Sequence, residues 1–137
     1  MQFKDFISQG KVVVGEKDLQ KAKALAKMSE RTFKSAQLLK LNNITASTIL
    51  ATAYESLRQV LEAICLQEGY KVYSHEAFTY YLKELREENL AEQFDRFRKL
   101  RNGVNYYGKP VSAIIASDAR KKIAKLNTLL KEKYLKC

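Results

Sequence analysis

The sequence predicts an all-α fold, an up-and-down bundle of four to five helices, and three observations support this prediction. Only five Gly and one Pro occur in 137 residues, which leaves little room for the frequent turns of an all-β protein. Apolar residues recur every three or four positions over long stretches, the period of an amphipathic helix. Ser, Asn and Gly fall between these stretches, where helices begin and end. The expected helices span residues 17–39, 44–67, 75–87, 90–102 and 119–134.

The composition indicates one globular domain. A chain with 46% hydrophobic and 29% charged residues can bury roughly two thirds of its unfolded surface without metals or disulfides. Neither Cys65 nor Cys137 has a second cysteine nearby, so we expect ordinary thiols, no metal and no cofactor. There is no signal-peptide pattern and no apolar run of ~18 residues. We therefore expect a cytoplasmic protein that does not enter the membrane.

The N-terminal residues 1–16 are expected to form an extended arm, followed by a single bundle domain over residues 17–137. Three valines between two glycines favour extended chain over helix. The arm is expected to pack on the body through Phe3, Phe6 and Ile7.

The first two helices are predicted by their apolar residues. Asn42 and Asn43 form the turn between them, because asparagine tolerates left-handed backbone and caps helices. The second helix carries few charges and ends at Gly69, so it is expected to be central or in an interface. If its Tyr54 is buried, the hydroxyl needs a partner. The expected buried stripe of the first helix is Leu19, Ala22, Leu25, Met28, Thr32, Phe33, Ala36 and Leu39.

The remaining helices follow from capping residues and apolar spacing. Residues 69–73 are expected to form a loop, with Ser74 capping the third helix and His75 in its first turn. For His75, the chain's one histidine, we expect a capping role rather than that of a surrogate catalytic base. Ser117 and Asp118 are expected to cap the last helix, whose inward residues are Ile123, Leu126, Leu130 and Tyr134.

The net charge of +10 is concentrated in the last third of the chain. Residues 1–95 hold 13 Lys/Arg and 13 Asp/Glu, whereas residues 96–137 hold 12 Lys/Arg and two acids. A concentrated basic region is typical of proteins that bind polyanions. The alternative is a solvated, lysine-rich surface that aids solubility.

One segment within this basic third, R-F-R-K-L-R-N-G-V-N-Y-Y-G at residues 96–108, combines a guanidinium, an amide and two phenols at the expected end of a buried helix. Arg101 can hold a phosphate through two hydrogen bonds, and Asn102 can orient it. The alternative roles are a structural salt bridge for Arg101 and a helix cap for Asn102. We expect Tyr106 or Tyr107 to lie beside Arg101, since adjacent residues cannot both face one way.

The order of these parts resembles the HEPN domains of bacteria and archaea. The matching pieces are the apolar helix A-Y-E-S-L-R-Q-V-L-E-A-I-C-L-Q-E-G-Y, the S-H-E opening, the R-x-x-R-N-x-x-x-Y-Y-G segment and the final S-D-A-x-x-x-I helix. They cover roughly residues 17–134. The resemblance implies a helical bundle that forms a homodimer, often a metal-independent ribonuclease encoded beside a minimal nucleotidyltransferase as a toxin–antitoxin pair.

The family's active motif is an Arg, a polar residue, and then a His four to six residues after the Arg. Arg101 and Asn102 match the first two positions, but Tyr106 and Tyr107 stand where the His is expected. A tyrosine, with an ordinary pKa near ~10, is a poor base at neutral pH but can donate a hydrogen bond to phosphate. The expected nucleic-acid contacts are Arg98, Lys99, Arg101 and Lys109.

Two functions are therefore carried forward. The first is an RNA- or nucleotide-binding dimer centred on Arg101, with Asn102, Tyr106 and Tyr107 as the catalytic remnant of a ribonuclease. The second is a non-catalytic interaction module that partners a nucleotidyltransferase-like protein. The missing His and the apolar second helix favour the second function, and the basic third favours the first.

Overall fold

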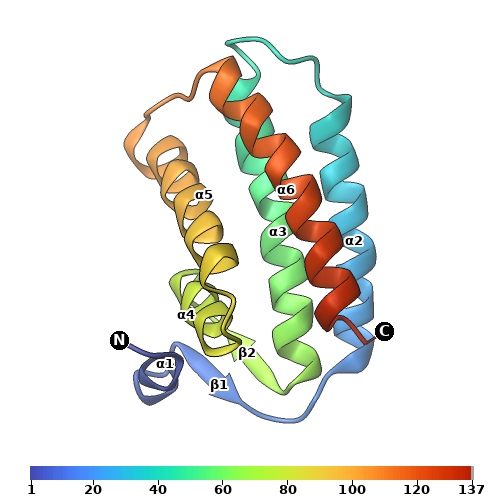
Figure 1. Cartoon of the computed structure of the whole chain (residues 1–137), viewed down its shortest axis with the longest axis vertical. Coiled ribbons are helices and arrows are strands. Elements are labelled where there is room, and N and C mark those ends of the chain that lie inside the picture. The colour runs from blue at the N-terminus through green and yellow to red at the C-terminus, as the bar shows by residue number, and fades with distance from the viewer. Residues whose placement is uncertain (137) are drawn as a thin grey trace.

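The computed structural model describes residues 1–136 and is mostly helical, as the sequence predicts. Over these residues it has six helices rather than four to five, together with a two-stranded sheet. The two short helices, α1 and α4, lie at the same end of the molecule as the sheet (Figure 1). Four helices of at least 20 residues run side by side: α2 (Leu19–Leu38), α3 (Ala46–Gln67), α5 (Glu88–Tyr107) and α6 (Ala113–Tyr134).

Helix α3 is the central element, as its low charge content predicts. It contacts α2, α5, α6 and the sheet, and 15 of its 22 residues are buried. The Asn42 side chain accepts hydrogen bonds from the amides of Ile44 and Thr45, both at 2.9 Å, and so orders the predicted turn before α3. The other helices are placed against α3, whose largest buried side chains are Ile49, Leu50, Tyr54, Leu57, Leu61 and Ile64.

Helix α2 packs along α3 through a stripe that is narrower than predicted. Ala22, Ser29 and Ala36 are buried and recur every seven residues on one face. Leu19 and Met28, which were expected in the stripe, are exposed. Because successive helical residues point about 100° apart, Met28 cannot share the face that buries Ser29.

The N-terminal segment contains a helix where an extended arm is predicted. Helix α1 spans Phe3–Ser8. A helix of this length is not stable alone, and burial of Phe3 and Phe6 against the body supplies its stability. The centre of the Phe3 ring lies 5.1 Å from that of Tyr81, which attaches α1 to helix α4. The predicted packing of Phe3 and Phe6 is therefore confirmed. The predicted extended conformation is wrong for Phe3–Ser8 but is confirmed for the three valines, Val12–Val14, which form a strand.

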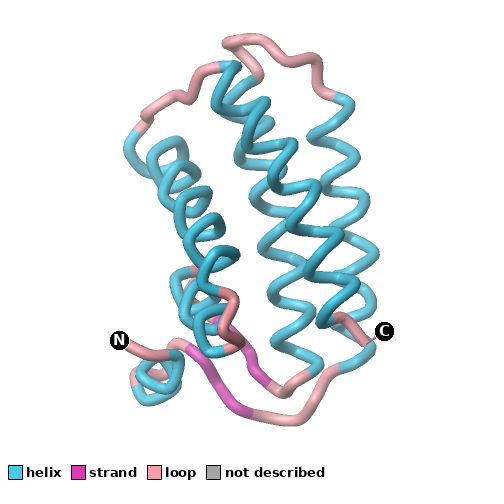
Figure 2. The backbone as a smooth tube through the Cα atoms, viewed as in Figure 1, coloured by secondary structure: helices cyan, strands magenta, loops and turns pink. Residues whose placement is uncertain are grey.

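A small antiparallel sheet closes the end of the molecule near the N-terminus (Figure 2). Strand β1 (Val12–Val14) pairs with β2 (Tyr70–Val72), so residues 69–73, predicted as a loop, contain a strand. Val12 lies opposite Val72 and is buried. The sheet connects the start of the chain to the end of α3.

Helices α4 and α5 differ from their predicted bounds. Helix α4 (Glu76–Glu84) is shorter than predicted, and His75 rather than Ser74 is its N-cap residue. Helix α5 continues past Asn102 to Tyr107. A glycine inside a helix costs about 1 kcal/mol relative to alanine, but Gly103 does not break α5. Gly108, in the left-handed conformation at φ = 62°, ends the helix instead.

Helix α6 begins six residues before its predicted start. The side chain of Ser112 caps it by accepting a hydrogen bond from the Ile115 amide at 3.2 Å. Asp118, predicted to be part of a cap, lies inside the helix and forms an ion pair with Lys122 at 3.2 Å. The expected inward residues Ile123, Leu126 and Leu130 are buried, whereas Tyr134 is half-buried.

Within the described residues, no helix is both long enough and apolar enough to cross a bilayer. Cys65 is a buried free thiol, as predicted. Cys137 lies outside the described residues.

Gly69 lies so close to Gly15 that a residue with a side chain would not fit at position 69. Gly69 has φ = 89°, and a Cβ at this position would lie 2.6 Å from the carbonyl oxygen of Gly15. We expect Gly69→Ala to lower the free energy of unfolding by about 2 kcal/mol or more in urea denaturation. Gly15→Ala is the matched control, because nothing lies within 4 Å of its added methyl group. Equal losses in the two variants would contradict the close approach.

Candidate functional site

Three helices meet at Tyr54, a fully buried tyrosine of α3. His75 reaches it from the start of α4, and Arg101 reaches it from the second half of α5. The Tyr54 ring also stacks on Phe94 of α5, with 5.6 Å between ring centres. The candidate site is therefore built around a rigid aromatic side chain on the central helix.

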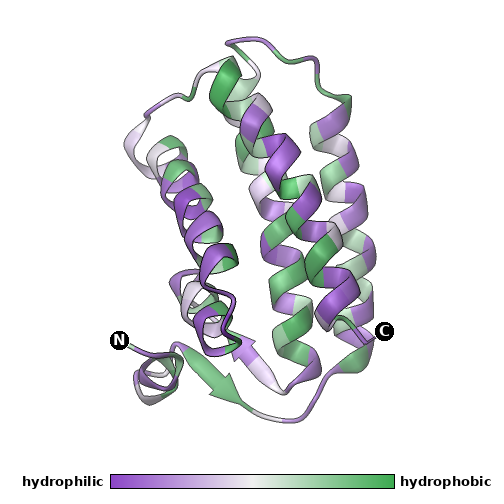
Figure 3. Ribbon diagram, viewed as in Figure 1, coloured by the Kyte–Doolittle hydropathy of each residue, from purple (hydrophilic) through white to green (hydrophobic). Residues whose placement is uncertain are grey.

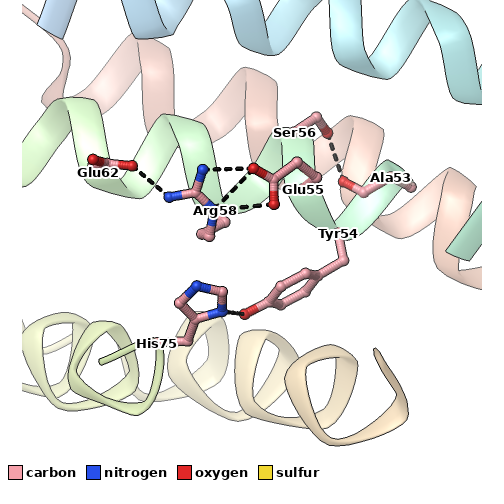
Figure 4. A network of polar contacts seen from close by, with 7 residues as sticks. All are labelled: Ala53, Tyr54, Glu55, Ser56, Arg58, Glu62 and His75. Atoms are coloured by element: carbon pink, nitrogen blue, oxygen red, sulfur yellow. Dashed lines mark hydrogen bonds and ion pairs between the residues drawn. The ribbon is translucent and has the colours of Figure 1, made fainter. Parts of the chain in front are cut away.

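The hydroxyl of Tyr54 and the Nδ1 of His75 are 2.9 Å apart (Figure 4). Burial raises the pKa of Tyr54 above its usual range, so the hydroxyl keeps its proton. Since it has no other hydrogen-bond partner among residues 1–136, we assign this hydroxyl as the donor and Nδ1 as the acceptor. The second ring nitrogen, Nε2, then carries the imidazole proton.

His75 is held neutral by its surroundings. Burial lowers its pKa, and the nearby positive charges of Arg58 and Arg101 lower it further. It occupies the N-cap position of α4, as expected, but its side chain makes no capping hydrogen bond there. The imidazole instead joins α4 to α3 through Tyr54.

A network of three charged residues lies on α3 beside Tyr54. The guanidinium of Arg58 donates to Glu55, with 3.0 Å between Nε and Oε2, and also to Glu62 (Figure 4). The spacing E-x-x-R-x-x-x-E places the three side chains on one helical face. The Arg58 side chain is only 19% exposed, and the two carboxylates neutralise its charge. Arg58 therefore serves the structure and is not free to bind an anion.

Arg101, in contrast, has aromatic neighbours and no acidic one. Its guanidinium carbon lies 5.7 Å from the centre of the Tyr54 ring and 5.4 Å from that of Tyr106. Its Nη1 is 3.3 Å from the Tyr106 hydroxyl and 3.4 Å from the Asn102 side-chain oxygen. No ion pair involves Arg101 anywhere in residues 1–136. Cation–π contacts of ~0.5–2 kcal/mol thus hold a positive charge that no carboxylate compensates.

The other predicted nucleic-acid contacts differ in whether they pair with an acidic residue. Arg98 and Lys99 both pair with Asp95, at 2.8 Å and 3.1 Å. Although partial burial acts to raise it, the pKa of Asp95 is held below its usual range by the hydrogen bond from Arg98. Lys109 is exposed, with its ammonium 6.0 Å from the centre of the Tyr107 ring. Of the four predicted contacts, Arg101 and Lys109 are therefore the two that have no ion pair within residues 1–136.

Of the two tyrosines expected near Arg101, Tyr106 makes the contact. Both Tyr106 and Tyr107 are exposed, and neither packs into the core. Gly108 turns the chain back, so that the Lys109 amide donates to the Gly103 carbonyl at 2.9 Å. The exposed groups near the end of α5 are therefore Tyr106, which contacts Arg101, and Tyr107, which contacts Lys109.

Sequence reasoning missed the Tyr54–His75 contact and the role of Arg58. The E-x-x-R-x-x-x-E spacing was a readable signal for the charged network. The histidine contact had none, because it joins residues 21 positions apart on two different helices.

Neither a protein-family model nor a curated protein matches this chain. Within the described residues, no three His, Cys, Asp or Glu side chains are grouped so that they would hold a metal ion. The function is therefore inferred from the chemistry of the Arg101 and His75 groups.

The lowered pKa of His75 gives the protein a pH-dependent stability. The unfolded chain takes up a proton near the ordinary histidine pKa of about 6.5, whereas the folded chain resists it. The contribution of the neutral His75 to the free energy of unfolding is therefore fully present above the ordinary pKa. It is lost as the pH decreases toward the lower pKa of the folded state. We expect urea unfolding to show a loss between about pH 8 and about pH 5.5 that is smaller in His75→Gln. Because His75 is the one histidine, equal losses in both proteins would rule out this account.

Proposed function

We propose that this chain is a HEPN-like helical protein that binds RNA around Arg101 and Asn102. The proposal draws on the resemblance of the segment 96–108 to the HEPN motif and on the contacts of Arg101. RNA is the ligand class because its phosphates suit a free guanidinium and its bases stack on exposed tyrosines.

The observation that carries the proposal is the uncompensated charge of Arg101. Arg96 and Arg98 lie on the same helix, but each pairs with an aspartate. Arg101 instead contacts the rings of Tyr54 and Tyr106, and of its guanidinium nitrogens only Nη1 makes a hydrogen bond within residues 1–136. A positive group that is already ordered loses little conformational entropy when it binds an anion.

The surroundings of Arg101 favour a polyanion. No acidic residue occurs between Asp95 and Asp118, a stretch of chain that includes Arg101, both exposed tyrosines and Lys109. Lysine and arginine attract the phosphate backbone, and each stacked base contributes about 1–3 kcal/mol. The proposed RNA path runs from Arg101 over Tyr106 and Tyr107 toward Lys109.

The proposed activity is that of a degenerate, metal-independent ribonuclease that retains binding and has lost most of its cleavage. Residues 101–108 contain no histidine, and proton transfer from a 2′-hydroxyl needs a group that titrates near neutral pH. The remaining catalytic contributions are a phosphate clamp by Arg101, orientation by Asn102 and hydrogen bonding by Tyr106. Tyr107, which contacts Lys109 rather than Arg101, is assigned to stacking.

A second candidate function, an interaction module for a minimal nucleotidyltransferase, is favoured by a different surface. Leu38, Ile44 and Ile114 are the three most exposed large aliphatic residues, and Ile44 and Ile114 are 90% and 82% exposed. The Asn43 side chain accepts a hydrogen bond from the Ala113 amide, which brings the two isoleucine-bearing segments together. Figure 3 shows apolar colour at the last turn of α2 and the first turn of α6, at one end of the molecule. Such an apolar surface suits a protein partner.

RNA binding can be tested with two arginine variants of one helix. We expect Arg101→Ala to weaken binding of a fluorescent single-stranded RNA by about tenfold or more, because a charge-assisted hydrogen bond is lost. Arg96→Ala removes the same charge from a residue already paired with Asp118 and should cost no more than about threefold. Fluorescence anisotropy measures both affinities, and circular dichroism checks the folds. Equal losses of affinity in the two variants would mean that the RNA is attracted only by the net positive charge of the protein.

Homodimerisation is proposed across a groove formed by α2, α3 and the end of α5. The groove has a volume of about 330 Å³, and its small hydroxyl side chains let a second copy approach closely; it is lined by Thr32, Ser47, Thr48, Ala51, Thr52, Glu55, Val104 and Asn105. We expect light scattering at micromolar concentration to give a dimer that Thr48→Arg converts to a monomer. Thr128→Arg, an exposed threonine on α6, is the control and should leave the dimer intact. A monomeric wild-type protein would contradict this assembly.

A further inference from the structure

His75 is a titratable group with no role in the RNA site proposed above. It contacts the same tyrosine as Arg101. The centre of the Tyr54 ring is 5.9 Å from the centre of the His75 ring and 5.7 Å from the guanidinium carbon of Arg101. Both side chains are partly exposed. Tyr54 therefore contacts both a cation and an imidazole, and Arg101 is near enough to His75 to lower its pKa.

Four charged residues act on the imidazole of His75. Arg58 and Arg101 lower its pKa, whereas the carboxylates of Glu55 and Glu62 on α3 raise it. Both glutamates are hydrogen-bonded to Arg58, and within residues 1–136 no carboxylate pairs with Arg101. An anion that binds Arg101 would add a negative charge to this group.

We propose that a phosphodiester of RNA held by Arg101 also accepts a hydrogen bond from Nε2 of His75, so that the site takes up a proton as RNA binds. This inference rests on the proposed RNA binding and adds a second contact from a different helix. The tautomer assigned through Tyr54 supports it, because Nδ1 accepts from the hydroxyl and Nε2 carries the hydrogen.

The direction of the coupling follows from electrostatics. In the free protein, burial and the two arginines oppose a charge on His75 and lower its pKa. A bound phosphodiester carries a constant negative charge, so it offsets Arg101 and favours the protonated imidazole. Because coupling is reciprocal, protonation of His75 must strengthen RNA binding by the same factor. Affinity should therefore rise as the pH falls through the histidine range.

The lone histidine makes the test direct. We would follow the single imidazole Cε1–H resonance by NMR as a function of pH, with and without a saturating 2′-O-methyl oligouridylate that cannot be cleaved at its 2′ positions. We expect the pKa of His75 to rise when the oligonucleotide is bound. In the wild type the affinity should increase about threefold to tenfold from about pH 8 to about pH 6, and His75→Gln should remove most of this increase.

The outcomes separate the two proposals. Oligonucleotide binding that depends on Arg101, with an unchanged His75 pKa and the same pH dependence in His75→Gln, would overturn the His75 contact and leave RNA binding in place. No Arg101-dependent binding at any pH would overturn both. If His75→Gln does not fold, the resonance of the wild-type protein alone still decides, because its pKa either rises with the oligonucleotide or does not.

Discussion

The contact between the buried Tyr54 hydroxyl and His75 sets the geometry of the site. A hydroxyl removed from water without a partner costs about 1–3 kcal/mol, so a tyrosine at the centre of α3 requires a polar group from elsewhere. His75 provides it at 2.9 Å and thereby fixes the start of α4 against α3. The Phe94 ring stacks on the same tyrosine and fixes α5, which carries Arg101 to its position. One side chain of the central helix thus orders three helices.

Two arginines near this contact, Arg58 and Arg101, differ in their neighbours. Arg58 lies between Glu55 and Glu62 and contributes a closed ion-pair network. Arg101 lies against aromatic rings, which attract its charge without neutralising it. The difference is between a cation paired with two carboxylates and one that pairs with none within residues 1–136. The proposed RNA site, its stacking surface and its coupling to His75 all depend on this difference.

The sequence predicted those features that local pattern encodes. The apolar run and Gly69 predicted α3 and its central position, and periodicity gave the inward face of α6. The missed features depend on tertiary packing. Helix α1 is stable only because Phe3 and Phe6 are buried, and α5 continues through Gly103 to a cap at Gly108. At the site, the local segment predicted Arg101 beside a tyrosine. It gave no sign of Tyr54 or His75, since these come from distant helices.

The NMR signals of the arginine side chains during an RNA titration show whether Arg101 binds the RNA. The chain has seven arginines, and selective 15N labelling resolves each Nε–H group. We expect the Arg101 resonance to shift along the binding isotherm, while those of Arg58 and Arg98, which are held by carboxylates, change little. Saturation of the RNA complex with an unmoved Arg101 resonance would contradict the proposed role of Arg101.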